Sequence, residues 1–122
     1  VIPASGFYEW TRQGENERLP WYLHDPNGPL LFAGSWQDWE RDGARHVTCA
    51  IVTTGANQTL SQIHKRCPVM LTENTMALWL GEEGKGAATL MTAPPEEMVH
   101  FYRVDPAVNS NRASGPDLTK PI

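Results

Sequence analysis

Two short stretches of this 122-residue chain carry the side chains best suited to chemistry. The stretch GFYEW places a single carboxylate, Glu9, among aromatic residues, and the stretch IHKRCPV places an imidazole, His64, beside two cations. An imidazole exchanges protons near neutral pH, and a carboxyl group in apolar surroundings can keep its proton and donate it. Glu9 and His64 therefore suit general acid–base catalysis.

Glu9 lies in a run from Val1 to Trp10 that is typical of a β-strand. Because side chains alternate along a strand, Phe7 and Glu9 share one face, whereas Tyr8 and Trp10 share the other. If Phe7 is buried, Glu9 points inward or into a cleft, where loss of water favours the protonated carboxyl group. The plainer alternative is a glutamate that faces solvent. Trp10 could offer an exposed surface on which a nucleic-acid base stacks.

His64 follows a short helix that we expect to begin near Asn57 and to end at Ile63. The neighbouring Lys65 and Arg66 attract phosphate, so an imidazole beside them suits work on a phosphate-bearing substrate. The spacing alone is weak evidence, since a single histidine after a helix is more often a structural or surface residue.

A paired His-x-x-Cys pattern raises the alternative of a structural zinc site at His46, Cys49, His64 and Cys67. Strand geometry argues against it, because residues three apart on a strand point to opposite faces. Pro68 biases Cys67 toward an extended conformation, so the second pair meets the same obstacle. We therefore expect no metal and no cofactor, with both cysteines acting as small apolar residues. Two cysteines make no disulfide framework, and a reducing cytosol is the default environment.

Antiparallel strands with short inserted helices must position these residues. Proline and an Asn-Gly pair predict a turn over Asp25–Pro29, and polar residues predict a hairpin loop over Thr11–Pro20. Thr72 and Pro94 are expected to open two further short helices. Further strands are expected over Trp21–His24, Leu30–Trp36, His46–Thr53, Cys67–Leu71 and Phe101–Val104. This order favours an α+β domain over a parallel βαβ fold.

Composition limits the classes of partner. Hydrophobic residues make up 40% and charged residues 20%, which suffices for one packed core. The net charge of −4 argues against a generic basic sheath for nucleic acid, although Lys65 and Arg66 allow a local cationic groove. No apolar run approaches the roughly 18 residues of a membrane span, and no secretory signal is visible. Val1 begins directly in a strand-like run, so we expect the natural chain to start earlier.

Six segments form a pattern that runs in order over nearly the whole chain, although no one of them would be specific alone. They are Ile2–Trp10 (IPASGFYEW), Phe32–Trp36 (FAGSW), Thr53–Asn57 (TTGAN), Ile63–Val69 (IHKRCPV), Trp79–Leu80 and Val104–Asn109. Together they resemble the SOS response-associated peptidase family, the SRAP domain. The resemblance implies that residues 1–122 are the C-terminal portion of a single SRAP domain. Its implied fold is α+β, with mainly antiparallel strands in a barrel-like sheet and short inserted helices.

The resemblance also implies a function and a set of site residues. The SRAP family shields abasic sites in single-stranded DNA by a covalent crosslink, in which a cysteine at the mature N-terminus closes a thiazolidine with the ring-opened sugar. By position, Glu9 and His64 match the active-site glutamate and histidine of the family. Arg66 matches a contact to the DNA backbone, Trp10 a base-stacking residue, and Thr53 a part of the pocket.

The chain departs from the family pattern at two places. Cys67 replaces a methionine, which changes the volume in an apolar slot. The N-terminal segment with the nucleophilic cysteine is absent, and the internal Cys49 and Cys67 have no α-amine, so we expect this chain alone to form no crosslink. The intact protein is expected to be a cytoplasmic, nucleoid-associated bacterial enzyme that binds single-stranded DNA with abasic sites and no membrane.

Two other functions stay open from the sequence. One is a single-stranded-DNA-binding or damage-sensing module without chemistry, and the other is a peptidase that cleaves other proteins. A cysteine at position two of the intact gene product would distinguish the crosslinking function from the first alternative.

Overall fold

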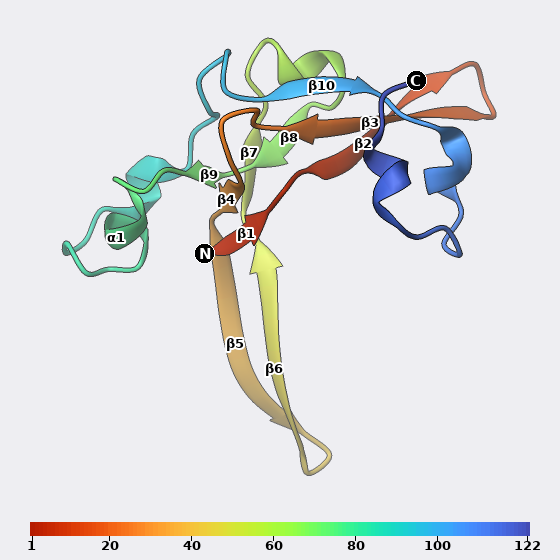
Figure 1. Ribbon diagram of the computed structural model, residues 1–122. Coiled ribbons are helices and arrows are strands. Elements are labelled where there is room, and N and C mark those ends of the chain that lie inside the picture. The colour runs from red at the N-terminus through yellow and green to blue at the C-terminus, as the bar shows by residue number, and fades with distance from the viewer.

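The computed structural model describes residues 1–122 (Figure 1). The strands are β1 (Ile2–Ala4), β2 (Phe7–Gln13), β3 (Glu17–His24), β4 (Leu30–Phe32), β5 (Gly34–Arg41), β6 (Ala44–Ile51), β7 (Thr53–Gly55), β8 (Arg66–Pro68), β9 (Met70–Leu71) and β10 (His100–Arg103). The one α-helix is α1 (Met76–Trp79), and the 3₁₀ helices are η1 (Leu60–Gln62), η2 (Ala87–Leu90), η3 (Pro106–Asn109) and η4 (Pro116–Thr119). No helix combines the length and the apolar character needed to cross a membrane.

The strands pair antiparallel in four small sheets. Two sheets are three-stranded, with orders β1–β4–β9 and β10–β3–β2, and the pairs β5–β6 and β7–β8 form the other two. The predicted α+β class with mainly antiparallel strands is confirmed. The strands do not close into a barrel, because every sheet ends in unpaired edges. In Figure 1, β2, β3 and β10 run together across the top, and the β5–β6 hairpin projects away from them.

The expected strand from Val1 to Trp10 is broken at Gly6 into β1 and β2. A Cβ atom on Gly6 would lie 2.4 Å from the Tyr22 ring and 2.6 Å from the Leu23 carbonyl oxygen. Only glycine permits this close approach of the chain to β3. The break lets β1 pair with β4 while β2 pairs with β3.

β2 and β3 form a longer hairpin than the sequence indicated. The segment Thr11–Pro20, expected as a loop, is paired as far as Gln13 and Glu17. The chain reverses around Gly14, whose φ of +72° lies in the left-handed region. The polar side chains in this stretch are mostly exposed, but their backbone groups stay in the ladder, which is why polarity alone suggested a loop.

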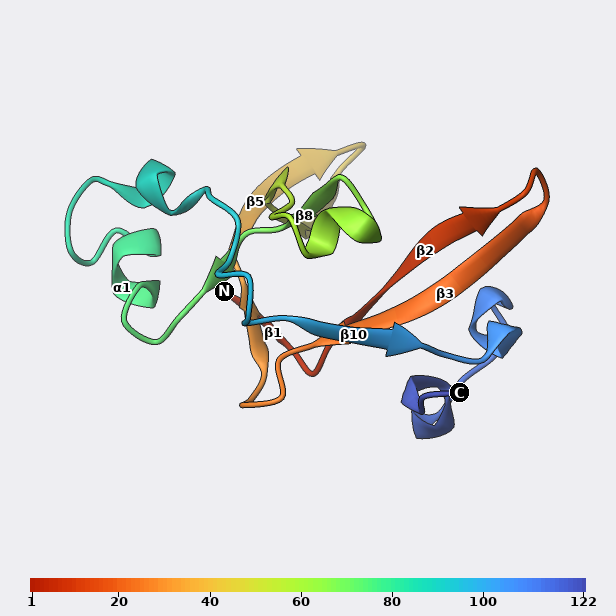
Figure 2. The same ribbon diagram turned by 90° about the horizontal axis from the view of Figure 1, so that it is seen from above.

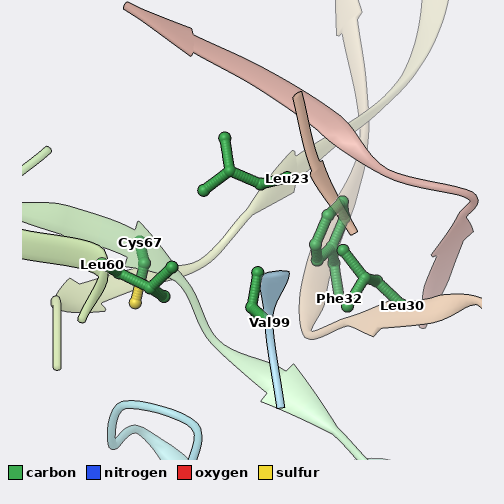
Figure 3. Close-up of a cluster of buried hydrophobic side chains, with 6 residues drawn as sticks. All are labelled: Leu23, Leu30, Phe32, Leu60, Cys67 and Val99. Atoms are coloured by element: carbon green, nitrogen blue, oxygen red, sulfur yellow. The ribbon is translucent and has the colours of Figure 1, made fainter. Parts of the chain in front are cut away.

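A buried apolar cluster, here called the central cluster, joins three of the four sheets. It consists of Leu23, Leu30, Phe32, Leu60, Cys67 and Val99. These side chains come from β3, β4, η1, β8 and the segment that precedes β10. Figure 3 shows Leu60 and Cys67 at one end of the cluster and Phe32 and Leu30 at the other, with Val99 between them. Segments distant in sequence thus share one core.

α1 is shorter than the sequence indicated. A helix was expected from Thr72 to Leu80, but the turn at Thr72–Thr75 remains outside it. The Thr75 hydroxyl accepts the backbone N–H of Thr72 at 2.9 Å, which fixes that turn. The indole of Trp79 then donates to the Gly34 carbonyl oxygen at 3.1 Å and docks α1 on the start of β5.

Candidate catalytic and nucleic-acid site

Arg66 is held against Thr53 where β7 pairs with β8. In this pair Gly55 lies opposite Arg66 and Thr53 lies opposite Pro68. The Nη2 group of Arg66 donates to the Thr53 carbonyl oxygen at 2.9 Å and to Thr53 Oγ1 at 3.0 Å. The N–H donors on Nε and Nη1 form no hydrogen bond with the protein, and the residue is exposed. The guanidinium is therefore oriented with free donors of the kind that bind phosphate.

His64 is held by the backbone of Arg66. The Arg66 N–H donates to Nδ1 of His64 at 3.1 Å, and the Arg66 carbonyl oxygen lies 3.1 Å from the same nitrogen. A neutral ring accepts the N–H through a lone pair on Nδ1 and carries its proton on Nε2. A protonated ring, or a neutral ring that carries its proton on Nδ1, can instead donate from Nδ1 to the carbonyl oxygen, so that Nε2 can lose a proton or accept one. The backbone thus satisfies Nδ1 in either protonation state and leaves the exposed Nε2 free to exchange a proton.

The segment that leads to His64 begins at Asn57. Asn57 Oδ1 accepts the Leu60 N–H at 2.8 Å, and Nδ2 donates to the Pro94 carbonyl oxygen at 3.0 Å. Leu60 and Ile63 are both buried and anchor η1, which occupies the place of the predicted short helix. The His64 N–H closes the last turn by donating to the Leu60 carbonyl oxygen at 3.0 Å. The imidazole therefore follows an anchored turn.

Glu96 braces the same segment from a distant part of the chain. Its carboxylate accepts the backbone N–H of Gln58 through Oε1 and that of Thr59 through Oε2, each at 2.8 Å. Hydrogen bonding by the Thr59 side chain, and then by the backbone of Thr59 and Gln58, lowers the pKa of Glu96. Glu96 is therefore a structural carboxylate that fixes the loop before η1.

Cys67 follows Arg66 directly and lies buried in the central cluster. Burial raises the pKa of the Cys67 thiol, and the nearby positive charge of Arg66 offsets only part of this effect. A buried, protonated thiol is a poor nucleophile and a poor metal ligand.

The His-x-x-Cys pair of His46 and Cys49 is divided between the two faces of β6. His46 stacks on Trp39 with ring centroids 4.5 Å apart, and Cys49 lies opposite Trp36 on the other face of the hairpin. No three His, Cys, Asp or Glu side chains are grouped closely enough to hold a metal ion.

Glu9 lies in the middle of β2, opposite Trp21 of β3. It shares a face with Phe7, which packs against the central cluster, as strand alternation predicts. Glu9 is half-buried, and its side chain forms no hydrogen bond or ion pair with another residue. Trp21 beside it meets Phe101 edge-on, with ring centroids 5.6 Å apart. The carboxylate therefore borders apolar surface and is unpaired.

Trp10 lies on the opposite face of β2 from Glu9. Its Nε1–H donates to Oδ1 of Asn109. The Arg18 guanidinium lies 5.1 Å from the centroid of the indole, which is a cation–π distance. The indole is half-buried and held in place by both partners. The ring is therefore held in a fixed orientation by Asn109 and Arg18.

These stretches fit a known protein family. The family described as SOS response associated peptidase (SRAP) matches residues 1–111. The chain belongs to the SRAP family. The abasic site processing protein YoqW of Bacillus subtilis (strain 168) is 31% identical over 123 residues, which cover 97% of this SRAP chain and 55% of YoqW. The abasic site processing protein HMCES of Rattus norvegicus is 30% identical over 151 residues, which cover 99% of this chain and 42% of HMCES.

The SRAP fold is also found in a solved structure. The crystal structure of a protein from Bacteroides thetaiotaomicron has a TM-score of 0.86 to this chain at 24% sequence identity. The match covers 99% of this chain and 55% of that one. The SRAP chain described here thus spans about half the length of the proteins it matches.

The predicted site residues of this SRAP chain fall into two groups. One group, joined by direct hydrogen bonds, contains Thr53, His64 and Arg66. The other contains Glu9 and Trp10, back to back on β2. No hydrogen bond or ion pair joins the two groups, and Figure 2 shows β2 and β8 as separate elements. Both groups border the central cluster, because β2 and β8 each pack side chains against it or within it.

Two residues that support the candidate site were missed from the sequence. Arg18 lies diagonally across the hairpin from Trp10, so a hairpin register extended into the expected loop would have revealed it. Glu96 gives no local signal, because its partners lie 37 and 38 positions earlier in the chain.

Proposed function

We propose that this chain supplies DNA-binding and acid–base residues of an abasic site processing protein. The observation that carries the proposal is the pair of contacts that Arg66 makes: its backbone N–H binds Nδ1 of His64 and leaves Nε2 free, and its guanidinium is held by Thr53 with donors left for phosphate. Membership of the SRAP family and the names of its relatives support this assignment. In the complete protein, the product is a protective covalent crosslink to an abasic site in single-stranded DNA.

Arg66 binds the DNA backbone in this proposal. Its orientation by Thr53 leaves the Nε and Nη1 donors for a phosphate group, and the exposed Lys65 adds a second positive charge. Thr53 thereby forms part of the pocket wall. Trp10 stacks against a base, which requires no particular base because every base has a π-face. These contacts position the strand without reading its sequence.

His64 opens the sugar ring of the abasic site. The protonated imidazole gives its Nε2 proton to the ring oxygen as the C–O bond breaks and keeps the proton on Nδ1, while the hydroxyl proton at the anomeric carbon leaves to water, which exposes an aldehyde. The hydrogen bond between Nδ1 and the Arg66 backbone keeps the ring oriented during this exchange.

Glu9 assists the bond formation that follows. The α-amine of an N-terminal cysteine, in a part of the protein outside this chain, adds to the aldehyde carbon, and loss of water gives an imine. Addition of the thiol to the imine carbon closes a thiazolidine, so one water leaves in the net reaction. Glu9 takes a proton from the attacking amine and returns one to the departing hydroxyl. Cys49 and Cys67 cannot replace this cysteine, because neither has an α-amine.

A pair of matched DNA substrates tests the proposal. The complete protein is incubated with single-stranded DNA that carries one abasic site, or with the same strand carrying a tetrahydrofuran analogue that cannot open to an aldehyde. A heat-stable band on a denaturing gel is expected with the first strand alone. Equal non-covalent binding of both strands without any adduct would overturn the chemistry and favour a damage-sensing module.

A further inference from the structure

The β5–β6 hairpin carries a line of exposed apolar side chains on one face. This apolar lane consists of Trp36, Val47, Cys49 and Ile51. The register places them together, because Trp36 lies opposite Cys49, Asp38 opposite Val47, and Gly34 opposite Ile51. Trp36 is 74% exposed, Val47 64% and Ile51 43%. Large apolar side chains exposed in a row mark an interaction surface.

On the opposite face of the hairpin, the large aromatic side chain already has partners within the hairpin. There the Trp39 ring stacks on His46, and its Nε1–H donates to Thr48 Oγ1 at 3.2 Å. At the distal end of the apolar lane, Arg45 pairs with Asp38 and sets a charged boundary. The apolar lane is therefore a bounded patch on one side of the hairpin.

The backbone of this hairpin also lacks neighbours. β5 and β6 pair only with each other, which leaves both outer edges unpaired, and every residue of β6 is exposed. An isolated two-stranded hairpin is marginally stable in water, and unpaired edges are templates for further strands. Figure 1 shows the hairpin extending alone from the body of the molecule. The exposed apolar lane and the unpaired edges of β5 and β6 therefore fit a partner that covers the lane and adds a strand to the sheet.

The first residues of the chain lie at the base of the apolar lane. Val1 and Ile2, together with Gly34, Trp36 and Cys49, line a hollow of about 310 Å³. Any chain joined to Val1 would emerge beside the lane. The matched relatives carry nearly as much chain again outside the matched region, which is enough to supply several strands. A tethered segment also reaches the lane at high effective concentration, which a second copy does not.

We propose that the apolar lane docks the part of this same protein that precedes Val1, which packs apolar side chains on Trp36, Val47, Cys49 and Ile51 and pairs a strand with an edge of β5 or β6. The proposal identifies the hairpin as the joint between the two halves of the SRAP domain. It rests on burial and strand pairing, and it holds whether or not the crosslinking chemistry proposed above is correct.

Thiol labelling of the protein expressed from its complete reading frame tests this joint. Cys49 is exposed here and Cys67 is buried, so Cys67 serves as an internal reference. A maleimide is added, and the two sites are resolved by peptide mass spectrometry in buffer and in urea. Cys49 is expected to react at least about tenfold more slowly in buffer than in urea. Rates for Cys49 within about threefold in the two solvents would overturn the proposal, given a folded protein.

Two further observations bear on the occupant of the apolar lane. Protection of Cys49 that disappears on dilution, in step with a dimer seen by size-exclusion chromatography, would assign the lane to a second copy and overturn the proposal. A reading frame that adds no residues before Val1 would overturn it as well. Concentration-independent protection in a monomer supports it.

A pair of variants locates the contact on one face. Val47→Lys places a charge in the apolar lane, whereas Gln37→Lys places the same charge on the opposite face at the adjacent pair, where Gln37 makes no side-chain hydrogen bond. Val47→Lys is expected to abolish Cys49 protection, and Gln37→Lys to leave it intact. If Val47→Lys does not fold, Val47→Thr and Gln37→Thr place the same smaller polar side chain at the two positions, and Cys49 protection is compared between them. Equal effects of the two positions would overturn the assignment of the face.

Discussion

Thr53 holds Arg66 through two hydrogen bonds of different kinds, one to its backbone carbonyl oxygen and one to its hydroxyl. The carbonyl is fixed by the pairing of β7 with β8, so it survives substitution of the side chain. The orientation of the guanidinium therefore depends on the strand pair as well as on the threonine. Substitution of Thr53 and substitution of Arg66 should therefore have different effects on the proposed DNA binding.

Arg66→Ala in the complete protein is expected to weaken binding to every single-stranded sequence and to lower the slope of log affinity against log salt by about 1. Thr53→Val is expected to have a smaller effect, because the carbonyl still orients the guanidinium. Fluorescence anisotropy at several salt concentrations measures both. Lys85→Ala, in an exposed loop, is the control for general charge loss. A salt slope for Arg66→Ala equal to that of Lys85→Ala would contradict a phosphate contact.

Glu9→Gln and His64→Ala are each expected to slow crosslinking by about 10²–10⁴-fold at neutral pH, the usual loss for a missing acid or base. Glu9→Gln preserves shape, so it isolates proton transfer from packing. Rates are measured with saturating abasic DNA, and DNA affinity should change much less. Less than additive loss in the double variant would show that the two residues act together. Rates within about twofold of wild type for both single variants would place the active site elsewhere.

Trp10→Ala is expected to cost about 1–3 kcal/mol in binding single-stranded DNA if a base stacks on the ring. The structure calls for a second variant, since Trp10 also donates to Asn109. Asn109→Ala removes that hydrogen bond and keeps the indole, so it should leave most of the affinity in place. An affinity loss for Asn109→Ala equal to that for Trp10→Ala would assign Trp10 a structural role.

Glu96→Gln is expected to lower the melting temperature at neutral pH by weakening the brace on Gln58 and Thr59. Because these hydrogen bonds lower the pKa of Glu96 in the folded state, the stabilisation is present above the ordinary value of 4.5 and is lost as the pH falls through the lowered value. The difference in melting temperature between wild type and variant should therefore shrink in acid. Glu97→Gln, at the exposed neighbouring carboxylate, is the control. A difference that stays constant from neutral pH into strong acid would rule out the ionised brace.

The sequence correctly predicted a turn, two extended segments and the alternation of side chains along β2, because these features depend on neighbouring residues. The turn over Asp25–Pro29 forms as expected, with the Asn27 N–H donating to the Asp25 side chain at 2.8 Å. The expected extended segment Cys67–Leu71 is present as β8 and β9, and the expected last strand is present as β10. Alternation correctly placed Glu9 and Phe7 on one face of β2.

Long-range contacts decided the features that the sequence could not predict. The helix expected at Pro94 is a single turn closed by the Met98 N–H on the Pro95 carbonyl oxygen at 3.1 Å. Glu96 in this turn accepts hydrogen bonds from another loop, which a helix beginning at Pro94 would redirect. The strand breaks at Gly6, where the Tyr22 ring and the Leu23 carbonyl oxygen approach the backbone, and the residue pattern within β1 and β2 does not predict that contact.

β2 is an edge strand of its sheet, so the outer edge of β2 separates the sheet face that carries Glu9 from the face that carries Trp10. Under the proposed function, the sugar at Glu9 and the base on Trp10 belong to nucleotides on either side of that edge. The DNA backbone between these two nucleotides must then turn sharply around the outer edge of β2. Single-stranded DNA can make this turn through its backbone torsions, whereas a stacked duplex is too stiff to follow it. One edge strand would then select for DNA flexibility, so that the preference for unpaired DNA arises from the path of the backbone and needs no contact that recognises a base.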